Sequence, residues 1–288
     1  MHWQTARFLV SLDRPLVMGI VNATPDSFSD AGQFADADAA KRHCDQLVLE
    51  GADLLDIGGE STRPGARPPD TAEELARVMP VLRHAVTLGL PVSVDTSRPE
   101  VMRAALDLGV DIINDVRALS RPGALAQVAA HPHCGVCLMH MQGEPDTMQQ
   151  APDYLGDGVD QVVAWLRQRL TDLRAAGIAP QRITLDPGIG FGKTGVHNWA
   201  LLQRQQELLA LGQPLLVGWS RKSTLGTLTG RPVQDRLVAS VAAALASVQR
   251  GARILRVHDV AATVDALTVW HRAGLGVVPG ITSEATTP

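Results

Sequence analysis

The stretch VMGIVNATPDSFSDAG, residues 17–32, joins an apolar run to a polar loop. Val17, Ile20 and Val21 suit a buried strand, whereas the Pro, Asp and Ser residues that follow Asn22 cannot continue one. The same change from an apolar run to a polar or Gly-rich junction recurs seven more times along the chain, and a helical pattern follows each time. This pattern predicts an α/β barrel that carries its chemistry on the ends of its strands.

The predicted elements follow from apolar periodicity and from the residues that end each run. Strands are expected at residues 15–21, 53–57, 91–95, 111–114, 135–139, 182–185, 214–217 and 253–257. Helices are expected at about residues 36–50, 71–88, 123–130, 155–176, 198–210, 233–250 and 260–273, and another begins at Ser97. Residues 5–12 alternate weakly and predict a short N-terminal hairpin that closes the bottom of the barrel.

Size and composition predict one folded domain. The chain has 288 residues, a length at which an eight-stranded α/β barrel forms a single domain. Hydrophobic residues make up 45% and charged residues 19%, which is sufficient for a core and carries no signature of disorder. We expect one domain over residues 1–288, with its core at about 15–275 and a short disordered tail at 283–288.

Charge and hydropathy argue against two classes of partner. The net charge is −4 and no run of Lys or Arg is present, whereas a nucleic-acid-binding face must be basic. No apolar stretch approaches the ~20 residues that span a bilayer, and the N-terminus lacks the apolar region of a signal peptide. Three cysteines, an odd number, agree with a reducing compartment, so we expect a cytoplasmic protein.

Polar side chains gather at the predicted strand ends, which in a closed parallel barrel all face one rim. The candidates are Asn22, Thr62, Asp95, Asn114, Asp186, Lys222, Arg256 and His258. Any one of them could merely cap a helix or turn a loop, but so many coincidences are hard to explain that way. Carboxylates and an amide can accept hydrogen bonds from the N–H groups of a nitrogen heterocycle. The basic residues can bind phosphate oxygens, and the planar head of an Arg can also stack on a flat ring.

Two motifs are misleading. GFGKT, residues 190–194, resembles the end of a phosphate-binding loop, but Pro187 stands where the first Gly should be, so the nucleotide interpretation fails. The His and Cys residues between His131 and His140 look like a metal cluster. Because Cys137 lies inside a predicted strand and no second Cys pair exists, zinc is disfavoured.

Seven blocks of the sequence together resemble the dihydropteroate synthase family. In order from about Val17 to Asp259 they read NATPDSFSDAG, DIGGESTRPGA, SVDTS, IINDV, LDPGIGFGKT, GWSRKS and RVHDV. The resemblance implies a (β/α)8 TIM barrel that joins 4-aminobenzoate to 6-hydroxymethyl-7,8-dihydropterin diphosphate and releases pyrophosphate. It also implies a Mg²⁺ cofactor and a homodimer, for which we favour the helices at 233–248 and 260–270 as the interface.

The resemblance, carried over by position, implies roles for individual residues. It implies that the pterin is held by Asp95, Asn114, Asp186 and Lys222, with Met139 and Arg256 against its ring faces. It implies pyrophosphate contacts from Thr62, Arg256 and His258, and from Asn22 through Mg²⁺. It implies a 4-aminobenzoate site formed by Thr62, Arg63, Pro64, Phe191 and Ser223. The residues expected to act in catalysis are Asp95, Lys222 and Arg63.

These residue types favour a dissociative substitution. The sequence places no Ser, Cys or Lys beside a general base, so a covalent enzyme intermediate is not expected. Instead pyrophosphate leaves first, stabilised by Mg²⁺ and the basic residues, and the Asp95 carboxylate stabilises the cationic pterin methylene that the arylamine attacks. The loops after the first two strands are expected to close over the site and exclude water.

Two rival functions remain open at this point. A pterin-dependent methyltransferase domain would share the barrel and the pterin pocket, but the SRKS and RVHD blocks favour pyrophosphate chemistry. A non-catalytic paralogue that binds pterin should have lost part of the polar set, whereas all of it is present here.

Overall fold

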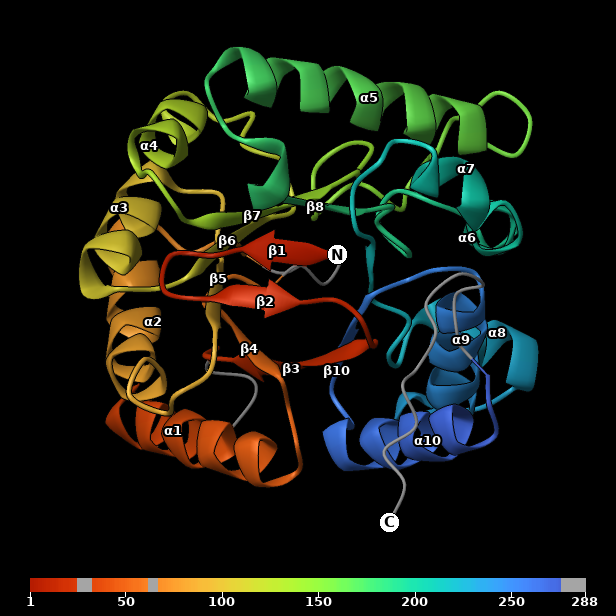
Figure 1. Cartoon of the computed structure of the whole chain (residues 1–288), viewed down its shortest axis with the longest axis horizontal. Coiled ribbons are helices and arrows are strands. Elements are labelled where there is room, and N and C mark those ends of the chain that lie inside the picture. Colours follow the sequence, from red (N-terminus) through yellow and green to blue (C-terminus); the bar gives the residue numbers. More distant parts are fainter. Residues whose placement is uncertain (25–32, 62–66, 276–288) are drawn as a thin grey trace.

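The computed structural model describes residues 1–24, 33–61 and 67–275 (Figure 1). Its strands are β1 His2–Gln4, β2 Leu9–Ser11, β3 Leu16–Asn22, β4 Leu54–Gly58, β5 Val92–Asp95, β6 Ile112–Asp115, β7 Gly135–Met139, β8 Ile183–Asp186, β9 Leu216–Val217 and β10 Ile254–Val257. Its α-helices are α1 Gln33–Leu49, α2 Thr71–Ala85, α3 Pro99–Leu108, α4 Ala124–Ala130, α5 Val159–Ala175, α6 Gly195–Gln203, α7 Gln205–Leu209, α8 Ser223–Thr229, α9 Leu237–Gln249 and α10 Val260–Arg272.

The predicted barrel is confirmed. Eight strands pair in the order β8-β7-β6-β5-β4-β3-β10-β9, and every pair is parallel. A parallel bridge between Leu185 of β8 and Leu215, just before β9, joins the two end strands. The helices lie around the outside of the sheet (Figure 1). All strand ends that precede a helix therefore face the same rim.

The N-terminal hairpin closes the opposite end of the barrel, as predicted. β1 and β2 pair antiparallel and lie across the strands in Figure 1. Trp3 is fully buried among the lower barrel residues, and its Nε1 donates to the carbonyl oxygen of Arg182 at 2.9 Å. Arg7 forms an ion pair of 2.6 Å with Asp111, which directly precedes β6. These contacts hold the hairpin at the amino-terminal ends of the strands.

Several predicted helix limits are wrong. α1 begins at Gln33, earlier than expected, and α5 begins only at Val159, because Gly156 and Gly158 have φ of 64° and 77° and interrupt the helical pattern. The helix expected over 198–210 is two helices that meet at Arg204. The expected start at 233 is a 3₁₀ turn, Val233–Asp235, and α9 follows it.

Helix α8 was not predicted. Its sequence, STLGTLT, combines a central Gly with β-branched Thr, which are poor helix formers. Gly226 is nevertheless suited to its place, because a Cβ there would lie 2.2 Å from the guanidinium of Arg236. Tertiary packing thus overrides a weak local preference. Among the described residues, no helix is both long and apolar enough to cross a membrane. The expected disordered tail lies outside the described residues.

Candidate active site

A cavity of about 730 Å³ opens at the carboxyl ends of the barrel strands. Its lining includes most of the predicted site residues, namely Asn22, Asp95, Asn114, Met139, Asp186, Phe191, Lys222, Ser223, Arg256 and His258. Thr62, Arg63 and Pro64 lie outside the described residues. Side chains up to about 240 positions apart in sequence thus meet at one opening.

The parallel register places the polar residues as neighbours. Asp95 at the end of β5 pairs with Asn114 of β6, and Met139 at the end of β7 pairs with Asp186 of β8. These strands are mostly apolar and buried, and each ends in a carboxylate, because the core takes the apolar residues and the strand end meets the cavity. The cavity floor therefore carries Asp95 on β5, Asn114 on β6 and Asp186 on β8, with Met139 of β7 between the last two.

Arg256 joins two acids, one of which, Asp95, lines the cavity with it. Its Nε lies 2.6 Å from Asp56 Oδ2, and its Nη2 lies 3.0 Å from Asp95 Oδ2. Asp56 Oδ2 also accepts from Asn114 Nδ2 at 3.1 Å. Asp56 is fully buried, and it was not among the predicted site residues. Its place in the apolar strand sequence LLDIG was the available signal, because a buried carboxylate needs a charged or hydrogen-bonding partner. Asp56 fixes the orientation of both Arg256 and Asn114.

Burial shifts the ionisation of the cavity groups. Desolvation raises the pKa of Asp95 to about 8. The positive charge of Arg256 lowers this pKa, whereas the negative charges of Asp56 and Glu60 raise it further. Desolvation also lowers the pKa of Lys222 to about 8, although Asp186 favours its charged form. The pKa of Asp186 is raised by burial, while the backbone N–H of Gly188 opposes the shift. Asp95 and Lys222 therefore both change charge near pH 8.

The turn after β9 presents Lys222 to the cavity. Arg221 has a φ of 60°, which is rare for a residue with a side chain. Two contacts hold it there: an ion pair of 2.6 Å with Asp259, and a hydrogen bond of 2.9 Å from its N–H to Ser240 Oγ. The Lys222 Nζ then lies 4.1 Å from the centre of the Phe191 ring. The surrounding structure thus stabilises a strained conformation at the cavity.

His258 follows β10 and faces the same cavity. Its Nδ1 lies 3.0 Å from Ser220 Oγ, which also accepts from the His258 N–H at 3.1 Å. Burial is the main cause that lowers the pKa of His258, to about 3, and the positive charges of Arg221 and Arg256 contribute less. The ring is therefore neutral at pH 7. It can therefore offer a hydrogen bond to an anion without adding charge.

The loop after β8 packs closely on its neighbours through glycines. Gly188 has a φ of 70°, and a Cβ there would lie 1.9 Å from the carbonyl oxygen of His140. Asn198, which is buried, accepts from the Gly190 N–H at 2.9 Å and donates to Thr224 Oγ1 at 2.9 Å. It was not predicted, and it ties the Phe191 loop to the start of α8. The glycines serve close backbone packing, and the nucleotide interpretation remains rejected.

Gly188→Ala should strongly destabilise the fold, by about 3 kcal/mol or more, because overpacking adds to the strain of a positive φ. The matched control is Gly177→Ala, where φ is 86° but no atom lies within 4 Å of the new Cβ. That change should cost only about 1 kcal/mol. Urea unfolding of both variants measures the difference, and equal losses would contradict the close contact at Gly188.

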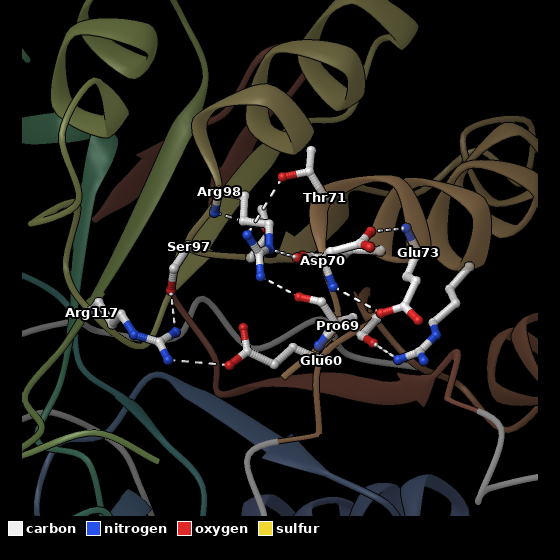
Figure 2. Close-up of polar contacts among 12 residues, drawn as sticks. Glu60, Pro69, Asp70, Thr71, Glu73, Ser97, Arg98 and Arg117 are labelled. Atoms are coloured by element: carbon white, nitrogen blue, oxygen red, sulfur yellow. Dashed lines mark hydrogen bonds and ion pairs between the residues drawn. The ribbon is translucent and has the colours of Figure 1, made fainter. Parts of the chain in front are cut away.

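The rim on the β4 side is joined by a network of polar contacts (Figure 2). Glu60 follows β4 and forms an ion pair of 3.2 Å with Arg117. At the other end of the same loop, Arg98 donates to the carbonyl oxygen of Pro69. Asp70 caps α2 by accepting from the Glu73 N–H at 2.8 Å, and Glu73 Oε2 accepts from the Asp70 N–H at 2.9 Å. The described ends of the loop are thus fixed to the scaffold.

The described part of the chain offers little for a metal held by protein alone. No three His, Cys, Asp or Glu residues within it lie where they could share an ion. Asn22, which ends β3 and lines the cavity, presents a carboxamide there. Such a donor fits Mg²⁺, which often takes one or two protein oxygens and completes its shell with water and phosphate.

Comparison with known proteins agrees with this geometry. The family described as pterin binding enzyme matches residues 18–258. A dihydropteroate synthase of Neisseria meningitidis serogroup B is 55% identical over 281 residues, covering 96% of this chain and 98% of the relative.

Two solved structures from Xanthomonas albilineans are also similar. A dihydropteroate synthase with 4-aminobenzoic acid has 51% identity and a TM-score of 0.87, covering 94% of this chain and 96% of that one. A second, in complex with 7,8-dihydropteroate, has 48% identity and a TM-score of 0.87, covering 97% and 100%. The chain therefore belongs to the dihydropteroate synthase family of pterin binding enzymes and is a transferase of that type.

Proposed function

We propose that this chain condenses 4-aminobenzoate with 6-hydroxymethyl-7,8-dihydropterin diphosphate to form 7,8-dihydropteroate and pyrophosphate. The observation that carries the proposal is the cavity at the strand ends in which Asp95, Asn114, Asp186, Lys222 and Arg256 meet. The family assignment favours this reaction over a methyltransferase, since the relatives compared above are synthases over nearly their full length.

The acidic floor of the cavity suits the pterin. Asn114 and Asp186 offer acceptors to ring N–H groups, and their burial makes an unpaired donor or acceptor costly. In this proposal Lys222 donates to the ring, while Met139 and the planar head of Arg256 lie against its faces. Asp56, by holding Arg256 and Asn114, orients two of these contacts.

The side of the cavity at the ends of β3 and β10 suits the pyrophosphate, because it carries basic and amide side chains. Arg256 and the neutral ring of His258 can donate to its oxygens, and Asn22 would hold Mg²⁺. When bound, Mg²⁺ supplies positive charge to the leaving phosphate oxygens. Thr62, by analogy with the family, belongs to the same group.

The 4-aminobenzoate is proposed to lie at the outer part of the cavity. Phe191 and Ser223 line the cavity, and Asn198 connects their neighbours Gly190 and Thr224 by hydrogen bonds. Phe191 offers a ring face, and the N–H groups at the start of α8 suit a carboxylate. Thr62, Arg63 and Pro64 are assigned here by analogy with the family alone, and so is the catalytic role of Arg63.

The proposed reaction is dissociative. The bond between the pterin methylene and the diphosphate oxygen breaks first, and the bonding electrons leave with the pyrophosphate. The ionised Asp95 carboxylate stabilises the cationic pterin that remains, as a preorganised charge does for a developing opposite charge. The amine nitrogen of 4-aminobenzoate then donates its electron pair to the methylene and loses a proton.

A direct assay tests this function. Purified protein, supplied with the pterin diphosphate, 4-aminobenzoate and Mg²⁺, should release pyrophosphate and dihydropteroate in equal amounts. Omission of 4-aminobenzoate should abolish dihydropteroate formation. Pterin binding without product would instead support the non-catalytic alternative.

A homodimer is also proposed, with the surface of α8, α9 and α10 as its interface. Large apolar side chains are exposed on all three helices, including Leu228, Val238 and Val269. α9 and α10 pack together, so their exposed faces can form one continuous apolar surface. Sedimentation velocity should give twice the 30.7 kDa of one chain, and Val238→Glu should shift the protein towards the monomer.

A further inference from the structure

We infer that Arg117 is a positioning residue, which holds the Glu60 carboxylate in a fixed ion pair and so shields Asp95 from it. The inference rests on the proposed function, because Asp95 is the group whose charge matters there. Arg117 does not line the cavity, whereas Glu60 does. Arg117 therefore acts through a neighbour and not by contact with a substrate.

Arg117 joins the exits of four consecutive barrel strands. Its Nη2 lies 3.2 Å from Glu60 Oε1 after β4, and its Nη1 donates to Ser97 Oγ after β5 at 3.0 Å. Its Nε donates to Glu144 Oε2 after β7 at 2.8 Å, and Arg117 itself follows β6. Every guanidinium nitrogen is used, which a lysine could not reproduce. Figure 2 shows the contacts to Glu60 and Ser97.

The backbone that carries Arg117 is itself fixed. Asp115 is fully buried, and its carboxylate accepts from the Arg117 N–H at 2.8 Å, from the Leu119 N–H at 2.7 Å and from Ser97 Oγ. Ala118 and Leu119 have φ of 49° and 59°, a strained conformation for residues with side chains. This structure holds the guanidinium in one place.

Burial makes the ion pair with Glu60 important. The side chains of Glu60 and Arg117 are each 7% exposed, so water screens them little. Glu60 is one of the acids that hinder ionisation of Asp95, together with Asp56 and Asp115, whereas Arg256 favours it. Without Arg117, the Glu60 charge would act on Asp95 uncompensated.

The test is the pH profile of kcat/KM for the pterin diphosphate. Arg117→Met should move the acid limb to higher pH by about one unit, because an uncompensated buried charge nearby disfavours the Asp95 carboxylate. In the double variant Arg117→Met/Glu60→Gln, the acid limb should lie at the same pH as in the unmodified protein, or at a lower pH. Glu144→Gln is the matched control: this partner is 61% exposed, and its loss should leave the profile unchanged.

A purely structural role would lower the melting temperature without moving the limb, and that result would overturn the inference. If Arg117→Met does not fold, Arg117→Gln replaces it: this variant keeps N–H donors for Glu60 but removes the positive charge, so it should also move the acid limb to higher pH. No shift in that variant would also overturn the inference. Loss of the proposed function is a separate outcome, since the unmodified protein would then form no dihydropteroate at any pH.

Discussion

Asp95→Asn should lower kcat by about 10²–10³ fold, the usual loss when a preorganised electrostatic group is removed from a transition state. The substitution keeps the size of the side chain and its place beside Asn114. It removes the negative charge that would stabilise the pterin cation, which exists only after pyrophosphate departs. Binding of the neutral pterin ring in the ground state should therefore change much less than turnover.

Steady-state kinetics and calorimetric titration of a pterin ligand measure the two effects separately. The control is Asp107→Asn, which removes the same charge from an exposed position on α3. Wild-type turnover in Asp95→Asn would refute the electrostatic role. An equal loss of binding and turnover would show that Asp95 merely holds the pterin.

The same residue predicts the acid limb of the pH profile. Below its pKa of about 8 Asp95 is protonated, so the ionised fraction, and with it kcat/KM, should rise with pH up to about 8. In Asp95→Asn this limb should be absent from the residual activity.

Lys222→Met should weaken pterin binding by about 10–10² fold, since a hydrogen bond from a charged donor contributes about 1.5–3 kcal/mol. Lys222 and Asp186 both line the cavity, and the charge of Asp186 helps to keep Lys222 protonated. Without the cation, Asp186 takes up a proton more readily and loses its value as an acceptor. The effect should therefore appear in the pterin Kd, in contrast to Asp95→Asn.

Two further variants separate charge from general disturbance. Lys222→Arg keeps the charge but not the shape. Because Lys222 loses its proton above about pH 8, the alkaline limb of the unmodified protein should extend to higher pH in this variant. Lys41→Met on α1 removes an exposed ion pair with Asp38 and should leave binding unchanged. Unchanged pterin affinity in Lys222→Met would remove Lys222 from the pterin site.

The barrel could be predicted because each strand is an apolar run that ends abruptly, and this signal is local. β7 was predicted with its observed limits, as was the start of α10 at Val260. Helix α8 could not be predicted, because its Gly and Thr residues favour other conformations and only packing against Arg236 and α9 makes it a helix. The break at Arg204 and the late start of α5 depend in the same way on turns that periodicity does not record.

By itself, the sequence determined the order of the barrel strands, most of the helices between them and the polar residues placed where strands end, because apolar periodicity and turn residues act over short distances. It also carried the family motifs. Only the tertiary structure decided which charges meet. Asp56 is paired with Arg256 across 200 positions, Arg117 with Glu60 across 57, and Asn198 connects Gly190 with Thr224. Such pairs, and the pKa shifts that burial gives them, arise only when the barrel closes and excludes water from its rim.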